Sequence, residues 1–346
     1  MQSCTTASGY FTTGHEQSKM KGVTGMTTKQ FVTEEMREKL VQLNGEERFA
    51  AEYAALLHPI VYMDWLKQLF VKEFCGEDEA EAEKRWTAAV DELNALQILY
   101  LSEQAELAKM KSGAAIPLLC ALGGRKGKML VKLAKQIKES IFYFFSTDDE
   151  EMYYALRFVS DWIDESSLTE KYAVLLESAA ENFDMSYVDA PRSETSKLFF
   201  ETAERLIDRC SQDIAKNAAV LCRLYRAVGT MNSAMGNLLK CIELKEKAFA
   251  MGRKYLGEKD ETTLDCMRNL AYNCSMAGMA ERGAELLEKR LNIYKGMSSA
   301  GSKAVRRAEK DFNEFCAEIE KKKRMDSAEE TESARFELDK LKAKPE

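Results

Sequence analysis

The segment at residues 122–138, LGGRKGKMLVKLAKQIK, has the residue types of a phosphate-binding loop, because glycines and lysines run directly into a helix-like stretch. A Walker A loop needs a glycine, four residues, a Gly-Lys pair and then Ser or Thr. Counted back from Gly127-Lys128, the first position is Leu122, and the position that requires Ser or Thr is Met129. The pattern therefore excludes a P-loop here.

The same stretch could instead contact an anionic partner. Between Glu106 and Glu139 the sequence has eight Lys or Arg and no acid, although the chain has a net charge of -7. Helical residues advance by about 100° each, so a helix starting near residue 128 places lysines on one face and apolar residues on the other. The candidate nucleic-acid contacts are Arg125, Lys126, Lys128, Lys132 and Lys135. The alternative is an ordinary surface helix with a solvated face, which is the commoner origin of such a stripe.

The sequence shows no other pattern that is typical of a catalytic or metal-binding site. Two histidines, His15 and His58, argue against a histidine metal site or a Ser-His-Asp triad. The nine cysteines have no CxxC spacing, so we expect free thiols in a reducing compartment and a cytoplasmic protein. Paired acids such as Asp148-Asp149 stand at a predicted helix start, where the helix dipole favours negative charge. We therefore expect no enzyme activity, no cofactor and no metal.

Composition predicts an all-α fold. The chain of 346 residues has only four prolines, none of them between 192 and 344, and that region is dense in strong helix formers. Strand is expected only in a few residues near 96–110, with LQILYLS at 96–102 as the candidate. The negative net charge argues against a protein that coats nucleic acid. No apolar run reaches transmembrane length and no secretory signal is visible, so no membrane partner is expected.

Changes in composition suggest how the chain is divided. The predicted parts are a disordered leader at 1–28, a helical N-terminal domain at 29–165, helical repeats at 166–325 and a charged tail at 326–346. In the N-terminal domain, two helices lead into the candidate strand and then into the basic turn. This order is winged-helix-like, and it would place the basic turn on the backbone of a nucleic acid.

The clearest regularity is an internal repeat. SAMGNLLKCIELKEKAF at 233–249 aligns with SMAGMAERGAELLEKRL at 275–291 at a shift of 42 residues. The identical pairs include Ser233 with Ser275, Gly236 with Gly278, Glu243 with Glu285, Glu246 with Glu288, and Lys247 with Lys289. A period of this size indicates stacked helix-turn-helix units, none of which can bury its apolar face alone.

The segment at 248–271, AFAMGRKYLGEKDETTLDCMRNLA, resembles the junction between tetratricopeptide repeats of the kinesin-light-chain type. A helix ends at Leu256-Gly257, a polar linker follows, and the next helix contains Arg-Asn-Leu-Ala at 268–271, where the family has Asn-Asn-Leu-Ala. The usual His-Pro of the linker is missing. The match is firm over 240–295. The resemblance implies an α-solenoid that binds a protein or peptide on its concave face.

By this resemblance, the first helix of each pair lines the binding surface. Asn269 matches a groove-facing asparagine of the family, Arg268 stands where a second asparagine is usual, and Asn273 lies one turn further on. Arg223 and Arg226 are on the equivalent helix of the preceding unit, and three arginines would favour an acidic peptide. The alternative is that these five side chains are simply exposed polar residues.

The sequence thus predicts a non-catalytic scaffold that binds a protein or peptide. The alternative is a nucleic-acid-binding regulator in which the array senses a peptide or forms a dimer.

Overall fold

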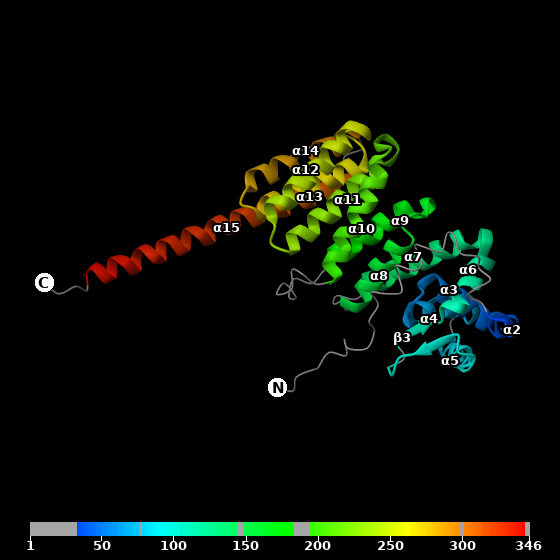
Figure 1. The fold of residues 1–346 in the computed structure, drawn as a ribbon. Coiled ribbons are helices and arrows are strands. Elements are labelled where there is room, and N and C mark those ends of the chain that lie inside the picture. The colour runs from blue at the N-terminus through cyan, green and yellow to red at the C-terminus, as the bar shows by residue number, and fades with distance from the viewer. Residues whose placement is uncertain are drawn as a thin grey trace. The chain divides into compact units, whose positions relative to one another are not determined.

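The computed structural model describes residues 33–76, 78–104, 106–143, 149–182, 194–297 and 301–342 (Figure 1). The predicted leader at 1–28 lies outside these residues. The chain forms two compact units that divide between Gln136 and Ile137, within one helix, whereas the sequence suggested a boundary at 165. Helix dominates both units, as predicted.

Unit 1 is built on helices several of which begin with a side-chain N-cap. Thr33 accepts a hydrogen bond from the backbone N–H of Met36 at 3.2 Å and so caps the first of these helices. Asn44 caps the next helix by forming a capping box with Glu47. The helices are α2 (Glu34–Gln42), α3 (Gly45–Leu57), α4 (Met63–Phe74), α5 (Glu79–Ala95), α6 (Ser112–Leu122) and α7 (Lys126–Tyr143), which continues into unit 2.

Unit 1 also holds a small antiparallel sheet of order β1-β3-β2. Its strands are β1 (Ile60–Tyr62), β2 (Leu99–Leu101) and β3 (Leu107–Met110). The prediction that strand is confined to residues near 96–110 holds for β2 and β3 but is wrong for β1. Strand β1 is defined by its pairing with β3, which lies far along the chain, so no local pattern in the sequence marks it. Helices α4 and α5 are followed by the β2–β3 hairpin, but α6 separates this hairpin from the basic turn, so the predicted passage from the strand directly into the basic turn is wrong.

Unit 2 is a series of helices. They are α8 (Asp149–Asp161), α9 (Thr169–Glu181), α10 (Glu194–Ser211), α11 (Ile214–Ala234), α12 (Leu238–Tyr255), α13 (Glu261–Met276), α14 (Ala280–Met297) and α15 (Lys303–Lys342). Helices α11 and α12 pack as a pair, α13 and α14 form the next pair, and α12 contacts α13. The stacked helix-turn-helix units that the 42-residue repeat predicted are therefore confirmed.

The two pairs turn in the same way. Gly236 has a φ of 79° and Gly278 a φ of 80°, in the left-handed region where a side chain is strained. The backbone N–H of Gly236 donates to Ser233 at 3.0 Å, and that of Gly278 donates to Ser275 at the same distance. The repeat seen in the sequence is thus a repeat of turn geometry.

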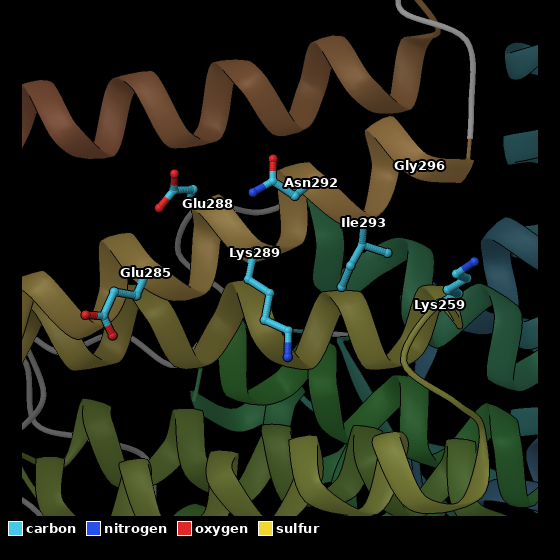
Figure 2. Close-up of a pocket in the computed structure, with 7 residues that line it drawn as sticks. All are labelled: Lys259, Glu285, Glu288, Lys289, Asn292, Ile293 and Gly296. Carbon is cyan, nitrogen blue, oxygen red and sulfur yellow. The ribbon is translucent and has the colours of Figure 1, made fainter.

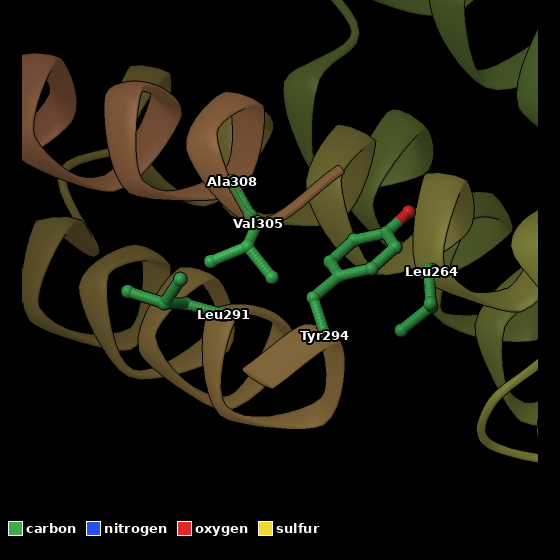
Figure 3. Packing of buried hydrophobic residues seen from close by; sticks show 5 residues of the cluster. All are labelled: Leu264, Leu291, Tyr294, Val305 and Ala308. Atoms are coloured by element: carbon green, nitrogen blue, oxygen red, sulfur yellow. The ribbon is translucent and has the colours of Figure 1, made fainter. Parts of the chain in front are cut away.

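Helix α15 closes the array by covering the second pair. Val305 and Ala308 of α15 pack with Leu291 and Tyr294 of α14 and with Leu264 of α13 (Figure 3). All five are at most 7% exposed. This cluster buries the apolar face that the last pair would otherwise present to water.

Replacing Gly283 by Ala should destabilise this end of unit 2. A Cβ at this position would lie 2.5 Å from Phe315 Cζ and 2.7 Å from the carbonyl oxygen of Ala271, and overpacking of this kind costs about 1–3 kcal/mol. Gly296→Ala on the same helix is the matched control, because a Cβ there meets nothing within 4 Å and alanine favours a helix by about 1 kcal/mol. Urea denaturation followed by circular dichroism should shift in opposite directions for the two variants. Equal shifts would contradict the close packing of α14 on α15.

Candidate functional site

The candidate binding surface lies on the first helices of the pairs. Helix α11 contacts α9 on one side and α13 on the other, and α12 packs behind α11 and α13. Side chains three to four residues apart on these first helices stay partly exposed, which marks one uncovered face. We call it the inner face, and its partly exposed side chains include Glu177, Arg223, Thr230, Asp265, Arg268, Asn269 and Tyr272.

Two of the predicted arginines share one carboxylate. Arg223 donates from Nη1 to Glu177 Oε2 at 3.1 Å, and Arg226 donates to the other oxygen of Glu177. Arg226 is only 9% exposed, so the expectation that it presents a free side chain to a groove is wrong. Because Glu177 belongs to α9 and both arginines belong to α11, these bonds hold α9 and α11 together.

The third arginine is bound by the closing helix. Arg268 donates from Nε to Asp311 Oδ2 at 2.9 Å, and Arg290 of α14 donates to the same oxygen at 3.0 Å. The Arg268 guanidinium also lies over the Tyr272 ring, 5.2 Å from its centroid. Arg268 remains on the inner face, but α15 already supplies it with a carboxylate.

The two predicted asparagines differ in exposure. Asn269 is partly exposed and donates from Nδ2 to the carbonyl oxygen of Asp265 at 3.0 Å. Asn273 is 7% exposed and accepts a hydrogen bond from the Cys241 thiol at 3.0 Å. The expectation that Asn273 faces the groove is therefore corrected, since its amide satisfies a buried thiol instead. Of the five predicted residues, Arg223, Arg268 and Asn269 lie on the inner face.

The basic stretch forms an amphipathic helix, as the periodicity predicted. Lys128, Lys132 and Lys135 are exposed on α7, while Leu130 and Leu133 are fully buried. Lys132 forms an ion pair with Glu73 at 2.9 Å.

The other two candidate contacts of this stretch differ in exposure, because Arg125 is exposed and Lys126 is not. Lys126 is half-buried. Arg125 donates from both terminal nitrogens to Glu52, at 3.0 and 2.9 Å, and Glu52 is 4% exposed. A two-pronged bond to a buried carboxylate gives Arg125 a role in holding α3 to the start of α7.

The winged-helix-like face of unit 1 has the wrong charge for a phosphate backbone. The exposed side chains on α5 and the β2–β3 turn are predominantly acidic, and they include Glu81, Glu83, Asp91, Glu92, Glu103 and Glu106, against the single exposed lysine Lys84 on α5. A recognition helix depends on cations that neutralise phosphates. This face therefore gives no support to nucleic-acid binding.

A depression of about 460 Å³ lies on the second helix of the last pair (Figure 2). Two lysines and two glutamates stand around it, and Lys289 forms an ion pair with Glu258 at 2.6 Å. Its lining consists of Lys259, Glu285, Glu288, Lys289, Asn292, Ile293 and Gly296. The charges balance, so the depression has no excess charge with which to hold an ion.

The described residues contain no group of three or more His, Cys, Asp or Glu placed to hold a metal ion. In the same part of the chain, no helix is long and apolar enough to cross a membrane.

Comparison with known families identifies the array. Residues 220–296 match the Tetratricopeptide repeat family. This range covers α12, α13, almost all of α14 and most of α11, so the segment is a tetratricopeptide-type helical repeat, as the sequence resemblance implied. No curated protein matches the chain.

Asp311→Ala should loosen α15. It leaves Arg290, which is 3% exposed, as a buried cation without its carboxylate, and such a loss costs roughly 3–5 kcal/mol. Glu309→Ala on the same helix is the control, because its ion pair with Lys295 is exposed and contributes less than about 1 kcal/mol. Hydrogen exchange over residues 303–324 should accelerate strongly in the first variant alone. Similar exchange in both variants would show that the ion pairs of Asp311 do not anchor the helix.

Proposed function

We propose that this protein is a non-catalytic adaptor that captures a peptide segment of a protein partner on the inner face of its tetratricopeptide array. The observation that carries the proposal is the polar, partly exposed surface that α9, α11 and α13 form together. Stacked helix pairs present an elongated surface, which suits an extended or helical peptide better than a small molecule.

The chemistry of the inner face fits a peptide backbone. Asn269 and Thr230 offer both donors and acceptors, Arg223 offers guanidinium donors, and Tyr272 adds an aromatic ring. Helix α9 lies beside α11 and lengthens this surface beyond the residues that match the family. A peptide could therefore run across at least three first helices.

We further propose that the protein has no catalytic activity and works in the cytoplasm. In support of the first, the arginines Arg223, Arg226 and Arg268 bind carboxylates of neighbouring helices, which is a structural use of charge. In support of the second, the described cysteines are free thiols and five of them are buried, which suits a reducing compartment.

The combined change Arg223→Ala, Asn269→Ala and Tyr272→Ala should reduce peptide capture. These three side chains are partly exposed, so the variant should stay folded while its affinity for peptides bound by the unaltered protein falls by about tenfold or more. The measurement uses labelled full-length protein on an array of synthetic peptides, followed by titration of the peptides that bind.

The matched control removes the same residue types from the second helices. Arg253 and Tyr255 of α12 and Asn292 of α14 are exposed, and their joint replacement by Ala should leave capture unchanged. Equal loss in both variants would contradict binding at the inner face, and so would undiminished capture by the first variant.

A further inference from the structure

The two matched repeats exchange leucine and cysteine at two buried positions of their first helices. At a shift of 42 residues, Cys222 of α11 is equivalent to Leu264 of α13, and Leu224 of α11 is equivalent to Cys266 of α13. All four side chains are 0% exposed. Because leucine fills each of these positions in the other repeat, the apolar packing at this place does not require a thiol.

The two thiols meet between the first helices of the repeats. Helix α11 packs against α13, and a hydrogen bond joins the side chains of Cys222 and Cys266. Cys222 Sγ also lies 3.3 Å from the carbonyl oxygen of Ala248 on α12, which fixes the direction of its side chain. A disulfide requires its sulfur atoms to approach to about 2 Å, so thiols that are already in contact need only a small movement of the two helices.

The other described cysteines have different neighbours. The Cys241 thiol donates to Asn273 Oδ1 at 3.0 Å. Cys120 is exposed on α6, and Cys210 is buried on α10 beside Arg209. Within the part of the chain that the structure describes, Cys222 and Cys266 are therefore the two thiols that are placed to react with each other.

The surroundings favour the thiolate form of Cys222. Its hydrogen bond with Cys266 lowers the pKa of Cys222, and the Arg226 guanidinium, one turn further along α11, also lowers it against the effect of burial. The same hydrogen bond and burial raise the pKa of Cys266, which therefore keeps its proton and acts as the donor. The thiolate is the reactive form of cysteine, so Cys222 is the nucleophile of the pair and Cys266 is the resolving thiol.

We propose that Cys222 and Cys266 are a peroxide-sensitive dithiol that forms a disulfide between the first helices of the two repeats. The Cys222 thiolate attacks one oxygen of hydrogen peroxide, the O–O bond breaks and hydroxide leaves, so that Cys222 becomes a sulfenic acid. The Cys266 sulfur then attacks the Cys222 sulfur, the S–O bond breaks, and the hydroxyl leaves with the Cys266 proton as water. Two thiols and one peroxide thus give one disulfide and two water molecules, and two electrons pass from sulfur to oxygen.

Burial selects the oxidant, and the position of the bond determines its effect. Because both thiols are 0% exposed, a molecule nearly as small as water can reach them through a local opening, whereas another protein cannot. Disulfides in a reducing compartment are usually transient and redox-sensing, which agrees with free thiols in the resting protein. Since α11 and α13 carry the inner face, the disulfide would fix the spacing of two helices that form this surface.

The test treats the full-length protein with hydrogen peroxide, unfolds it in N-ethylmaleimide to block the remaining thiols, and maps its tryptic peptides by mass spectrometry. The expected product joins NAAVLCR at 217–223 to DETTLDCMR at 260–268, and dithiothreitol should separate the two peptides. The oxidised protein should also melt about 5 °C or more above the reduced protein, because a disulfide that closes a long loop stabilises the native state.

Cys266→Ala should form no such cross-link and should leave Cys222 as a sulfenic acid that dimedone labels. Cys210→Ser is the matched control, because Cys210 is also buried, and it should form the cross-link as the unaltered protein does. If Cys266→Ala does not fold, Cys222→Ala replaces it and should leave Cys266 reduced. Blocking of both Cys222 and Cys266 by N-ethylmaleimide in unaltered protein whose exposed Cys120 is oxidised would overturn the dithiol, and so would cross-links between other cysteines in equal yield.

Discussion

The architecture of unit 2 depends on one constraint, which is that a single pair of helices cannot bury its apolar face by itself. Each pair must therefore be covered by the next element along the chain. Helix α12 covers α13, and α15 takes the place that a further first helix would occupy. The cluster of Leu264, Leu291 and Val305 shows how three successive helices share one core. This stacking of helices positions the side chains of the inner face.

Shared carboxylates fix how neighbouring helices meet. Glu177 binds two arginines of the next first helix, and Asp311 binds one arginine from each helix of the last pair. A partly buried carboxylate with two cationic partners favours one relative placement of the helices that carry it. The same bonds occupy arginines that would otherwise be free to bind a partner, so the array uses much of its positive charge internally.

The first repeat differs from the second in burying a cation, Lys245. The second repeat shows that Leu and Ala pack well at the equivalent positions, so the fold does not require a cation there. The lysine fits there because its stem passes Gly229 and its amine donates to Thr230. In unit 1 the exposed side chains of α5 are mainly acidic, so the order of its helices and strands does not by itself give it a nucleic-acid-binding function.

Local features of this protein followed from the sequence alone, because they depend on residues that are close along the chain. The period of 42 residues, the glycine turns at Gly236 and Gly278 and the lysine face of α7 are all of this kind. Only the tertiary structure decided which polar side chains are free to bind a partner. Arg226 and Arg268 meet carboxylates 49 and 43 residues away, and the Lys245 amine reaches the inner face only because Gly229 leaves room for its stem. Such partners have no fixed spacing in the sequence, so periodicity identifies the helix face on which a side chain lies but not the group that it meets there.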